Sequence, residues 1–142
     1  MGGSVTGVRT AARWALATFM IVAGVAHFAA TEEFLAQTPS FLPARTAIVY
    51  VSGAVEIALG GALLLWRSRR REVGWVLAAF FVLVFPGNLY QAISGTPAFG
   101  LDSGTARWGR LLFQPVLVAW ALWSTGAISG TSYRRSRRPP PR

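Results

Sequence analysis

The sequence contains no cysteine and no lysine, and it has one histidine and five acidic residues among 142 positions. Without cysteine the chain has no disulfide framework, no thiolate metal site and no dithiol relay to a quinone. A single histidine excludes bis-histidine haem ligation, and the sparse acidic residues predict no metal site. No cofactor is evident, so a redox cofactor must come from a partner protein or be a bound quinone.

Apolar residues make up 53% of the chain, which is too many for a soluble domain of this length. All fourteen basic residues are arginines, and the net charge is +9. These arginines lie at the ends of apolar runs, which is typical of membrane topology, so we predict no nucleic-acid partner. Arginine in place of lysine, with abundant alanine, glycine and valine, also suggests a GC-rich bacterial genome. We therefore predict a multi-pass protein of the bacterial cytoplasmic (inner) membrane, with the lipid bilayer as its first partner.

Four apolar runs approach the roughly 20 helical residues that cross a bilayer. The sequence predicts an all-α integral membrane four-helix bundle with spans at about 14–30, 47–66, 73–94 and 110–128. Residues 1–13 are an N-terminal lead, and residues 129–142 are a disordered basic tail. The first run also has the layout of a cleavable signal peptide, but its length and the three later spans favour a retained helix. The short basic connection at 67–72 predicts that the second and third spans are antiparallel neighbours.

The segment between the first two spans, residues 31–46, is too polar to cross a membrane and too apolar for a free loop. We predict a short interfacial helix there. Glu32 and Glu33 suit the first turn of that helix, and the Thr31 hydroxyl is expected to cap it.

The distribution of arginine predicts the orientation of the bundle. Eleven arginines lie in the lead, the second connection and the tail, against three on the other side. By the positive-inside rule both termini are cytoplasmic. A cytoplasmic basic tail attracts anionic lipid headgroups, at about 1 kcal/mol per arginine near the surface.

Glu56 is the anomaly around which the chain is organised, because it is a carboxylate near the middle of the second span. An ionisable group at that depth must face other helices or a water-filled cavity. Ser52 and Gly60 share its helical stripe, and Gly53 and Gly61 lie beside it. This small-residue groove predicts a close approach by a neighbouring helix.

Other polar residues fall at a similar depth in the outer half of the predicted bundle. Together with Glu56 they form the predicted ligand-binding or structural polar cluster: His27, Glu56, Asn88, Gln91, Arg110 and Gln114. An ion pair between Glu56 and Arg110, shared with His27 or the amides, would offset the desolvation of the carboxylate. Each residue also has a structural explanation, since histidine can pack or cap a helix and amides join helices for about 1 kcal/mol.

Four segments together resemble the DoxX-like family of small bacterial four-helix membrane proteins. They are AGVAHF (23–28), VSGAVEIALGGALLL (51–65), FPGNLYQA (85–92) and RLLFQPVLVAWALW (110–123), and they match in order and spacing. The resemblance extends over about residues 14–123. It implies a four-helix fold with recurring polar residues at His27, Glu56, Asn88, Arg110 and Gln114. It also implies an association with quinone-linked oxidoreductase systems, although most members have no established activity.

Three functions from different classes follow from these observations, and whether the chain is an enzyme stays open. The first is a membrane subunit of a quinone-linked oxidoreductase system, with oxidoreductase partner subunits. The second is a small-solute or lipid binding or transport protein, which at 142 residues would need to form a homo-oligomer to enclose a translocation path. The third is a structural membrane subunit whose buried polar residues fix helix register.

Overall fold

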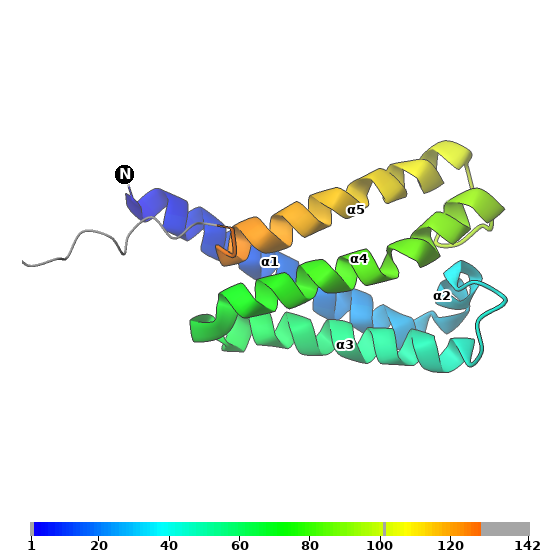
Figure 1. Cartoon of the computed structure of the whole chain (residues 1–142), viewed down its shortest axis with the longest axis horizontal. Helices are drawn as coiled ribbons and strands as arrows, with labels where there is room; N and C mark the ends of the chain where they lie inside the picture. The colour runs from blue at the N-terminus through cyan, green and yellow to red at the C-terminus, as the bar shows by residue number, and fades with distance from the viewer. Residues whose placement is uncertain (1, 101, 129–142) are drawn as a thin grey trace, which may run out of the picture.

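The computed structural model describes residues 2–100 and 102–128, and within them every regular element is helical. The elements are α1 (Gly2–Ala29), α2 (Thr31–Gln37), α3 (Arg45–Leu65), the short 3-10 helix η1 (Arg67–Arg69), α4 (Arg70–Ser94) and α5 (Gly104–Thr125). The four long helices run roughly side by side, and α2 lies across one end of the bundle (Figure 1). The all-helical prediction is confirmed. The predicted basic tail at 129–142 lies outside the described residues.

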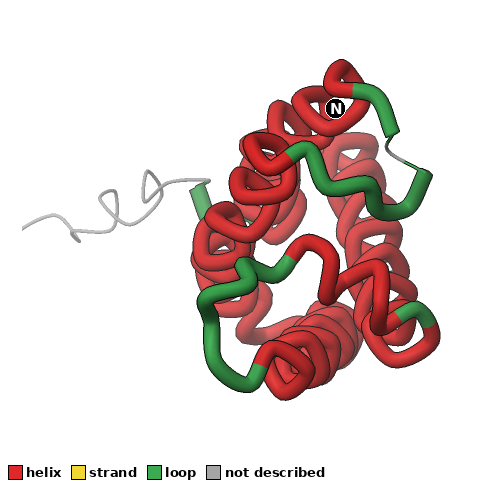
Figure 2. The backbone as a smooth tube through the Cα atoms, turned by 90° about the vertical axis from the view of Figure 1, so that its right-hand side faces the viewer, coloured by secondary structure: helices red, strands yellow, loops and turns green. Residues whose placement is uncertain are grey.

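The bundle consists of two antiparallel helix pairs. Helix α1 packs mainly against α3, and α4 packs mainly against α5. Although η1 joins α3 directly to α4, these two helices contact each other much less than either contacts its main partner. The two helices run antiparallel and contact each other, as predicted, but their main packing partners are α1 and α5 (Figure 1). Viewed from the α2 end, the long helices form a ring, and α2 lies in front of its middle (Figure 2).

Glycines bring α1 and α3 together almost backbone to backbone. A Cβ atom on Gly53 would lie 2.6 Å from Cβ of His27, and one on Gly24 would lie 2.6 Å from the carbonyl oxygen of Gly53. A Cβ on Gly60 would lie 2.9 Å from the carbonyl oxygen of Ala17. The predicted small-residue groove is thus an α1 contact at Gly53 and Gly60. Gly61 does not belong to it, because a Cβ there would meet nothing within 4 Å.

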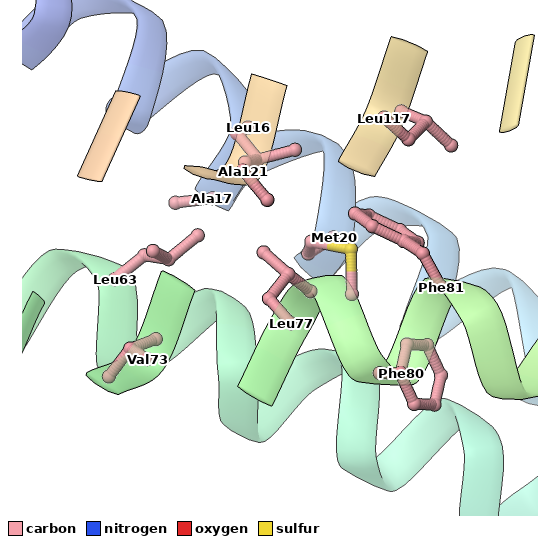
Figure 3. Close-up of a cluster of buried hydrophobic side chains, with 10 residues drawn as sticks. All are labelled: Leu16, Ala17, Met20, Leu63, Val73, Leu77, Phe80, Phe81, Leu117 and Ala121. Carbon is pink, nitrogen blue, oxygen red and sulfur yellow. The ribbon is translucent and has the colours of Figure 1, made fainter. Parts of the chain in front are cut away.

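An apolar core joins the two helix pairs in the half of the bundle away from α2. Ten buried side chains from all four long helices form it: Leu16, Ala17, Met20, Leu63, Val73, Leu77, Phe80, Phe81, Leu117 and Ala121 (Figure 3). Leu16, Met20, Leu63 and Leu77 are completely buried. Toward α2 the polar contacts run within each pair, between α1 and α3 and between α4 and α5, and that part of the bundle contains the site.

The helix ends correct several details of the sequence prediction. Helix α1 begins at Gly2 rather than near residue 14, because arginine ends an apolar run without ending a helix. The predicted short helix exists as α2, with Glu32 and Glu33 in its first turn. Its capping residue is Ala30, however, and the Thr31 hydroxyl instead donates to the carbonyl oxygen of His27 at 3.0 Å.

Among the described residues, three helices are long and apolar enough to cross a membrane: Val5–Ala29, Arg45–Leu65 and Arg67–Ser94. Helix α5 does not meet that measure, although it runs antiparallel to α4 and packs along it. It begins six residues before the predicted position of 110, with Ser103 Oγ accepting the backbone N–H of Ala106 at 3.1 Å. It ends at Thr125, where Gly126 adopts a left-handed conformation with φ 71°.

Candidate functional site

A cavity of about 660 Å³ lies between the helix pairs at the α2 end. All four long helices, α2 and the segment after α2 contribute to its wall. Most of the lining side chains are apolar, including Phe19, Phe80, Leu83 and Phe113. Leu83 is 76% exposed, so the cavity wall continues onto the outer surface of the bundle. The volume is within the range of pockets that bind small organic molecules.

His27 and Glu56 form an ion pair on one side of this cavity. Nδ1 of His27 lies 3.2 Å from Oε2 of Glu56 and 2.9 Å from the carbonyl oxygen of Ala23. Because a carbonyl oxygen only accepts hydrogen bonds, Nδ1 carries a proton that it donates to Ala23. Oε2 of Glu56 is itself buried, with the His27 imidazole beside it. Glu56 is also one of the residues that line the cavity, so a carboxylate side chain belongs to its wall.

Arg110 enters the cavity from α5, but its partner is an amide rather than a carboxylate. Its Nη1 donates to Oε1 of Gln91 at 3.1 Å, and its guanidinium lies 5.9 Å from the centre of the Phe99 ring. Among the described residues, Glu56 pairs with His27 and not with Arg110. The predicted Glu56–Arg110 ion pair is therefore wrong as a direct contact. Because α1 approaches α3 closely at Gly53, His27 lies within reach of the Glu56 carboxylate.

A hydrogen bond between Asn88 and Gln114 joins α4 to α5 in the cavity wall. Nδ2 of Asn88 donates to Oε1 of Gln114 at 2.7 Å, and Nε2 of Gln114 donates to the carbonyl oxygen of Phe81 at 2.6 Å. Pro86 lies in this part of α4 and lacks the N–H that a helix uses for its backbone bonds. Gln114 therefore reaches from the neighbouring helix to the α4 backbone about one turn before this proline.

Helix α2 closes the end of the cavity through aromatic and polar contacts. The Phe34 ring stacks on the His27 imidazole with centroids 3.6 Å apart, and it meets Phe99 edge to face at 4.8 Å. Oε2 of Glu33 accepts the backbone N–H of Phe99 at 2.6 Å. Arg45, the first residue of α3, donates to the carbonyl oxygens of Leu35 and Thr38. These contacts position α2 over His27.

The structure brings the six predicted site residues to one end of the bundle, as three contacting pairs. Five of them line the cavity: His27, Glu56, Asn88, Arg110 and Gln114. Gln91 is only 1% exposed and lies behind Arg110 rather than in the wall. The sequence analysis missed Phe34 and Gln37, which also line the cavity. Their position in an amphipathic segment next to the histidine was the available signal.

The arrangement supplies both hydrogen-bond acceptors and donors within an apolar enclosure. Glu56 places a carboxylate in the wall, and Arg110 offers guanidinium N–H groups beyond the one given to Gln91. A ligand with a polar head and an apolar body matches such a wall. Among the described residues no group of three potential ligands could hold a metal ion.

Comparison with known proteins identified one family. The model of a family described as "Domain of unknown function (DUF8561)" matches residues 16–125, a range that includes all six site residues. No curated protein matches the chain, and no solved structure matches it.

Proposed function

The chain belongs to the DUF8561 family, and we propose that it is an integral membrane protein whose cavity binds a quinone or a chemically similar lipophilic carbonyl compound. In this proposal it serves as a membrane subunit of an oxidoreductase system, and partner subunits supply the electron carriers. The observation that carries the proposal is the His27–Glu56 pair, with Arg110, in the wall of a mostly apolar cavity of about 660 Å³.

Membrane insertion is supported by the three long apolar helices and by the aromatic residues at both ends of the bundle. Trp66 and Trp75 lie at the α3–α4 connection, away from α2, and Trp14 lies on α1; Tyr50 and Trp108 lie near the starts of α3 and α5, and all five are exposed. Tryptophan and tyrosine prefer the two membrane interfaces. We propose that α5 also spans the membrane beside α4 and that both termini are cytoplasmic. The cavity then opens toward lipid near the outer face of a bacterial inner membrane.

The polar wall favours the head of a quinone over a purely apolar ligand. A quinone carbonyl accepts hydrogen bonds, and the free N–H groups of Arg110 can donate them. The hydroxyl of the reduced form donates, and the Glu56 carboxylate in the cavity wall can accept it. His27 keeps the carboxylate in place through their 3.2 Å contact. Apolar side chains such as Phe19 and Phe113 then contact the ring and its tail.

A second candidate function rests on Arg110 itself. Its guanidinium has no carboxylate within ion-pair distance among the described residues. Arginine binds carboxylates in a bidentate manner, so an anionic lipophilic molecule such as a fatty acid would also fit. Under this alternative the chain is a lipid or small-solute binding or transport protein, and it acts as a homo-oligomer if it transports.

The test is ligand-induced thermal stabilisation of the purified full chain in detergent. Decylubiquinone should raise the Tm of the wild type by about 5 °C when it saturates the site. Glu56→Gln should abolish most of that rise, since the amide has no negative charge to pair with His27 and replaces one of the two acceptor oxygens with an NH2 donor. Glu72→Gln is the matched control, because Glu72 is exposed in the first turn of α4 and does not line the cavity. An equal rise in all three proteins, or none in any, would contradict quinone binding at this cavity.

Decanoate separates the two candidate ligands. If it raises the Tm of the wild type and Arg110→Gln removes the effect while decylubiquinone does nothing, the anionic-solute function replaces the quinone proposal. If Glu56→Gln and Arg110→Met lower the Tm equally and neither compound has any effect, the cluster has only a structural role. The resemblance to DoxX-like proteins supports the proposal of quinone binding. That resemblance is itself a proposal, whereas membership in the DUF8561 family is shown.

A further inference from the structure

Arg13 occupies a core position at the end of the bundle opposite the cavity. It precedes Leu16 and Ala17 on the buried face of α1, and those two residues are 0% exposed. Arg13 is itself only 4% exposed, although it carries a full positive charge. Its Nε is buried and has no hydrogen-bond partner, and no described acidic residue forms an ion pair with it. A buried arginine is normally paired, so this one lacks a counterion.

The charged side chains nearest to Arg13 are also positive, so they increase its need for a counterion. Arg67 of η1 and Arg70 of α4 lie close enough to repel Arg13 electrostatically. The one acidic side chain in this part of the chain is Glu72, which is exposed and forms no ion pair among the described residues. The sequence after residue 128 adds five arginines and no acidic side chain. The chain therefore supplies no carboxylate side chain to neutralise this cluster.

Two more buried polar atoms lie unbonded at the same end. Trp120 of α5 donates from Nε1 to the carbonyl oxygen of Ala12 at 3.0 Å, which fixes α5 beside this part of α1. One turn further along α5, Oγ of Ser124 is buried without a partner. One turn earlier along α1, Nε of Arg9 is likewise buried and unbonded, and the guanidinium lies 5.8 Å from the Trp123 ring centre. Three potential donors from two helices thus have no acceptor within the described chain.

We propose that Arg13, with Arg67 and Arg70, binds a phosphate group at this end of the bundle. Arginine suits this ligand because its planar guanidinium matches phosphate oxygens with two parallel hydrogen bonds. The group is carried either by an anionic phospholipid headgroup or by free phosphate. The site is separate from the cavity, and it does not depend on the proposed quinone binding.

The experiment compares three additives on the purified full chain in a nonionic detergent. Dihexanoyl phosphatidylglycerol presents an anionic lipid headgroup, dihexanoyl phosphatidylcholine presents a zwitterionic one, and inorganic phosphate presents the free anion. The readout is the change in Tm at constant ionic strength. Arg13→Gln removes the buried charge, and Arg69→Gln is the matched control because it removes one exposed arginine from the same connection.

We expect phosphatidylglycerol to raise the Tm of the wild type and of Arg69→Gln by about 5 °C, and phosphatidylcholine to have a much smaller effect. Arg13→Gln should lose most of the rise. If inorganic phosphate gives the same rise and the same loss, the site is confirmed and its occupant is free phosphate. Equal stabilisation of wild type and Arg13→Gln by every additive would overturn the proposal.

A second variant keeps the test valid if Arg13→Gln does not fold. The double substitution Arg67→Gln with Arg70→Gln changes only exposed side chains, so it should leave the core intact. It should reduce the rise in Tm with phosphatidylglycerol by more than half. A full rise in this double variant would show that the two arginines do not belong to the site and would also overturn the proposal.

Discussion

Nδ1 of His27 lies 3.2 Å from Oε2 of Glu56, and this pair joins α1 to α3 at the wall of the cavity. The contact depends on Gly53, because Cβ of His27 occupies the space that a side chain at position 53 would fill. The Phe34 ring covers the other side of the imidazole. The ion pair, the close packing of α1 on α3 and the position of α2 therefore all depend on His27.

The pair should behave as a coupled unit in a double-mutant cycle. We expect His27→Leu and Glu56→Gln each to lower the free energy of unfolding, because each removes one side of a largely buried contact. The double variant should be less destabilised than the sum by about 1 to 2 kcal/mol. Reversible unfolding in mixed micelles measures the three values. Strict additivity would show that the two side chains do not interact.

Two glycines on α3 provide a matched comparison of helix packing. Gly53→Ala should destabilise the protein by about 1 to 3 kcal/mol, since the new methyl group would lie 2.6 Å from Cβ of His27 and 2.8 Å from the Gly24 carbonyl oxygen. Gly61→Ala should be neutral or stabilising by up to about 1 kcal/mol, because nothing lies within 4 Å and alanine favours the helix. The same micelle unfolding measurement applies. Similar values for the two variants would argue against the α1–α3 contact.

Arg45 should control the order of the segment that covers the cavity. It donates to Thr38 at 2.9 Å and also to Leu35, so one side chain holds the end of α2. Arg45→Gln should increase hydrogen exchange in residues 31–44 by about tenfold, which corresponds to a loss of about 1.4 kcal/mol. Exchange in α4 should not change, and Arg69→Gln serves as the control variant. Unchanged exchange in residues 31–44 would show that the segment is held by other contacts.

The absence of native cysteine makes the proposed orientation directly measurable. Ser40, Ser68 and Thr105 are all exposed, and each can be replaced singly by cysteine. A membrane-impermeant maleimide should label Ser40→Cys and Thr105→Cys in intact cells, and Ser68→Cys only after lysis. Labelling of Ser68→Cys alone in intact cells would reverse the orientation. Different results for Ser40→Cys and Thr105→Cys would show that the two ends of the proposed α4–α5 hairpin are wrongly placed.

The fold was largely predictable because long apolar runs and their arginine ends are strong local signals. They located α3 and α4 to within three residues at every end, and the short helix before α3 was also found. The start of α1 was missed because polar residues such as Thr6 and Arg9 end an apolar span but not a helix. Helix pairing was not predictable from the length of the connection at 67–72. It was decided by where glycines permit backbone contact, at Gly24, Gly53 and Gly60.

The polar site was predictable as a region but not as a set of partners. Helical spacing and depth placed His27, Glu56 and Arg110 at one end, and all three line the cavity. The pairing of these polar side chains depends on differences in distance no longer than one side chain. A single sequence does not specify such distances. The carboxylate therefore pairs with His27, while Arg110 bonds to Gln91. Phe34 of α2 stacks on His27 of α1. Because the two residues lie on different helices, the periodicity of a single helix does not predict this contact.

The apolar core and the cavity share Phe80, Phe81 and Leu117, so the cavity begins where the core ends. On one side of these residues the core joins the two helix pairs, and on the other side the cavity lies between them. A ligand that widened the cavity would therefore press directly on side chains that hold the two pairs together. We expect a change of occupancy to alter the packing of both aromatic rings in the core.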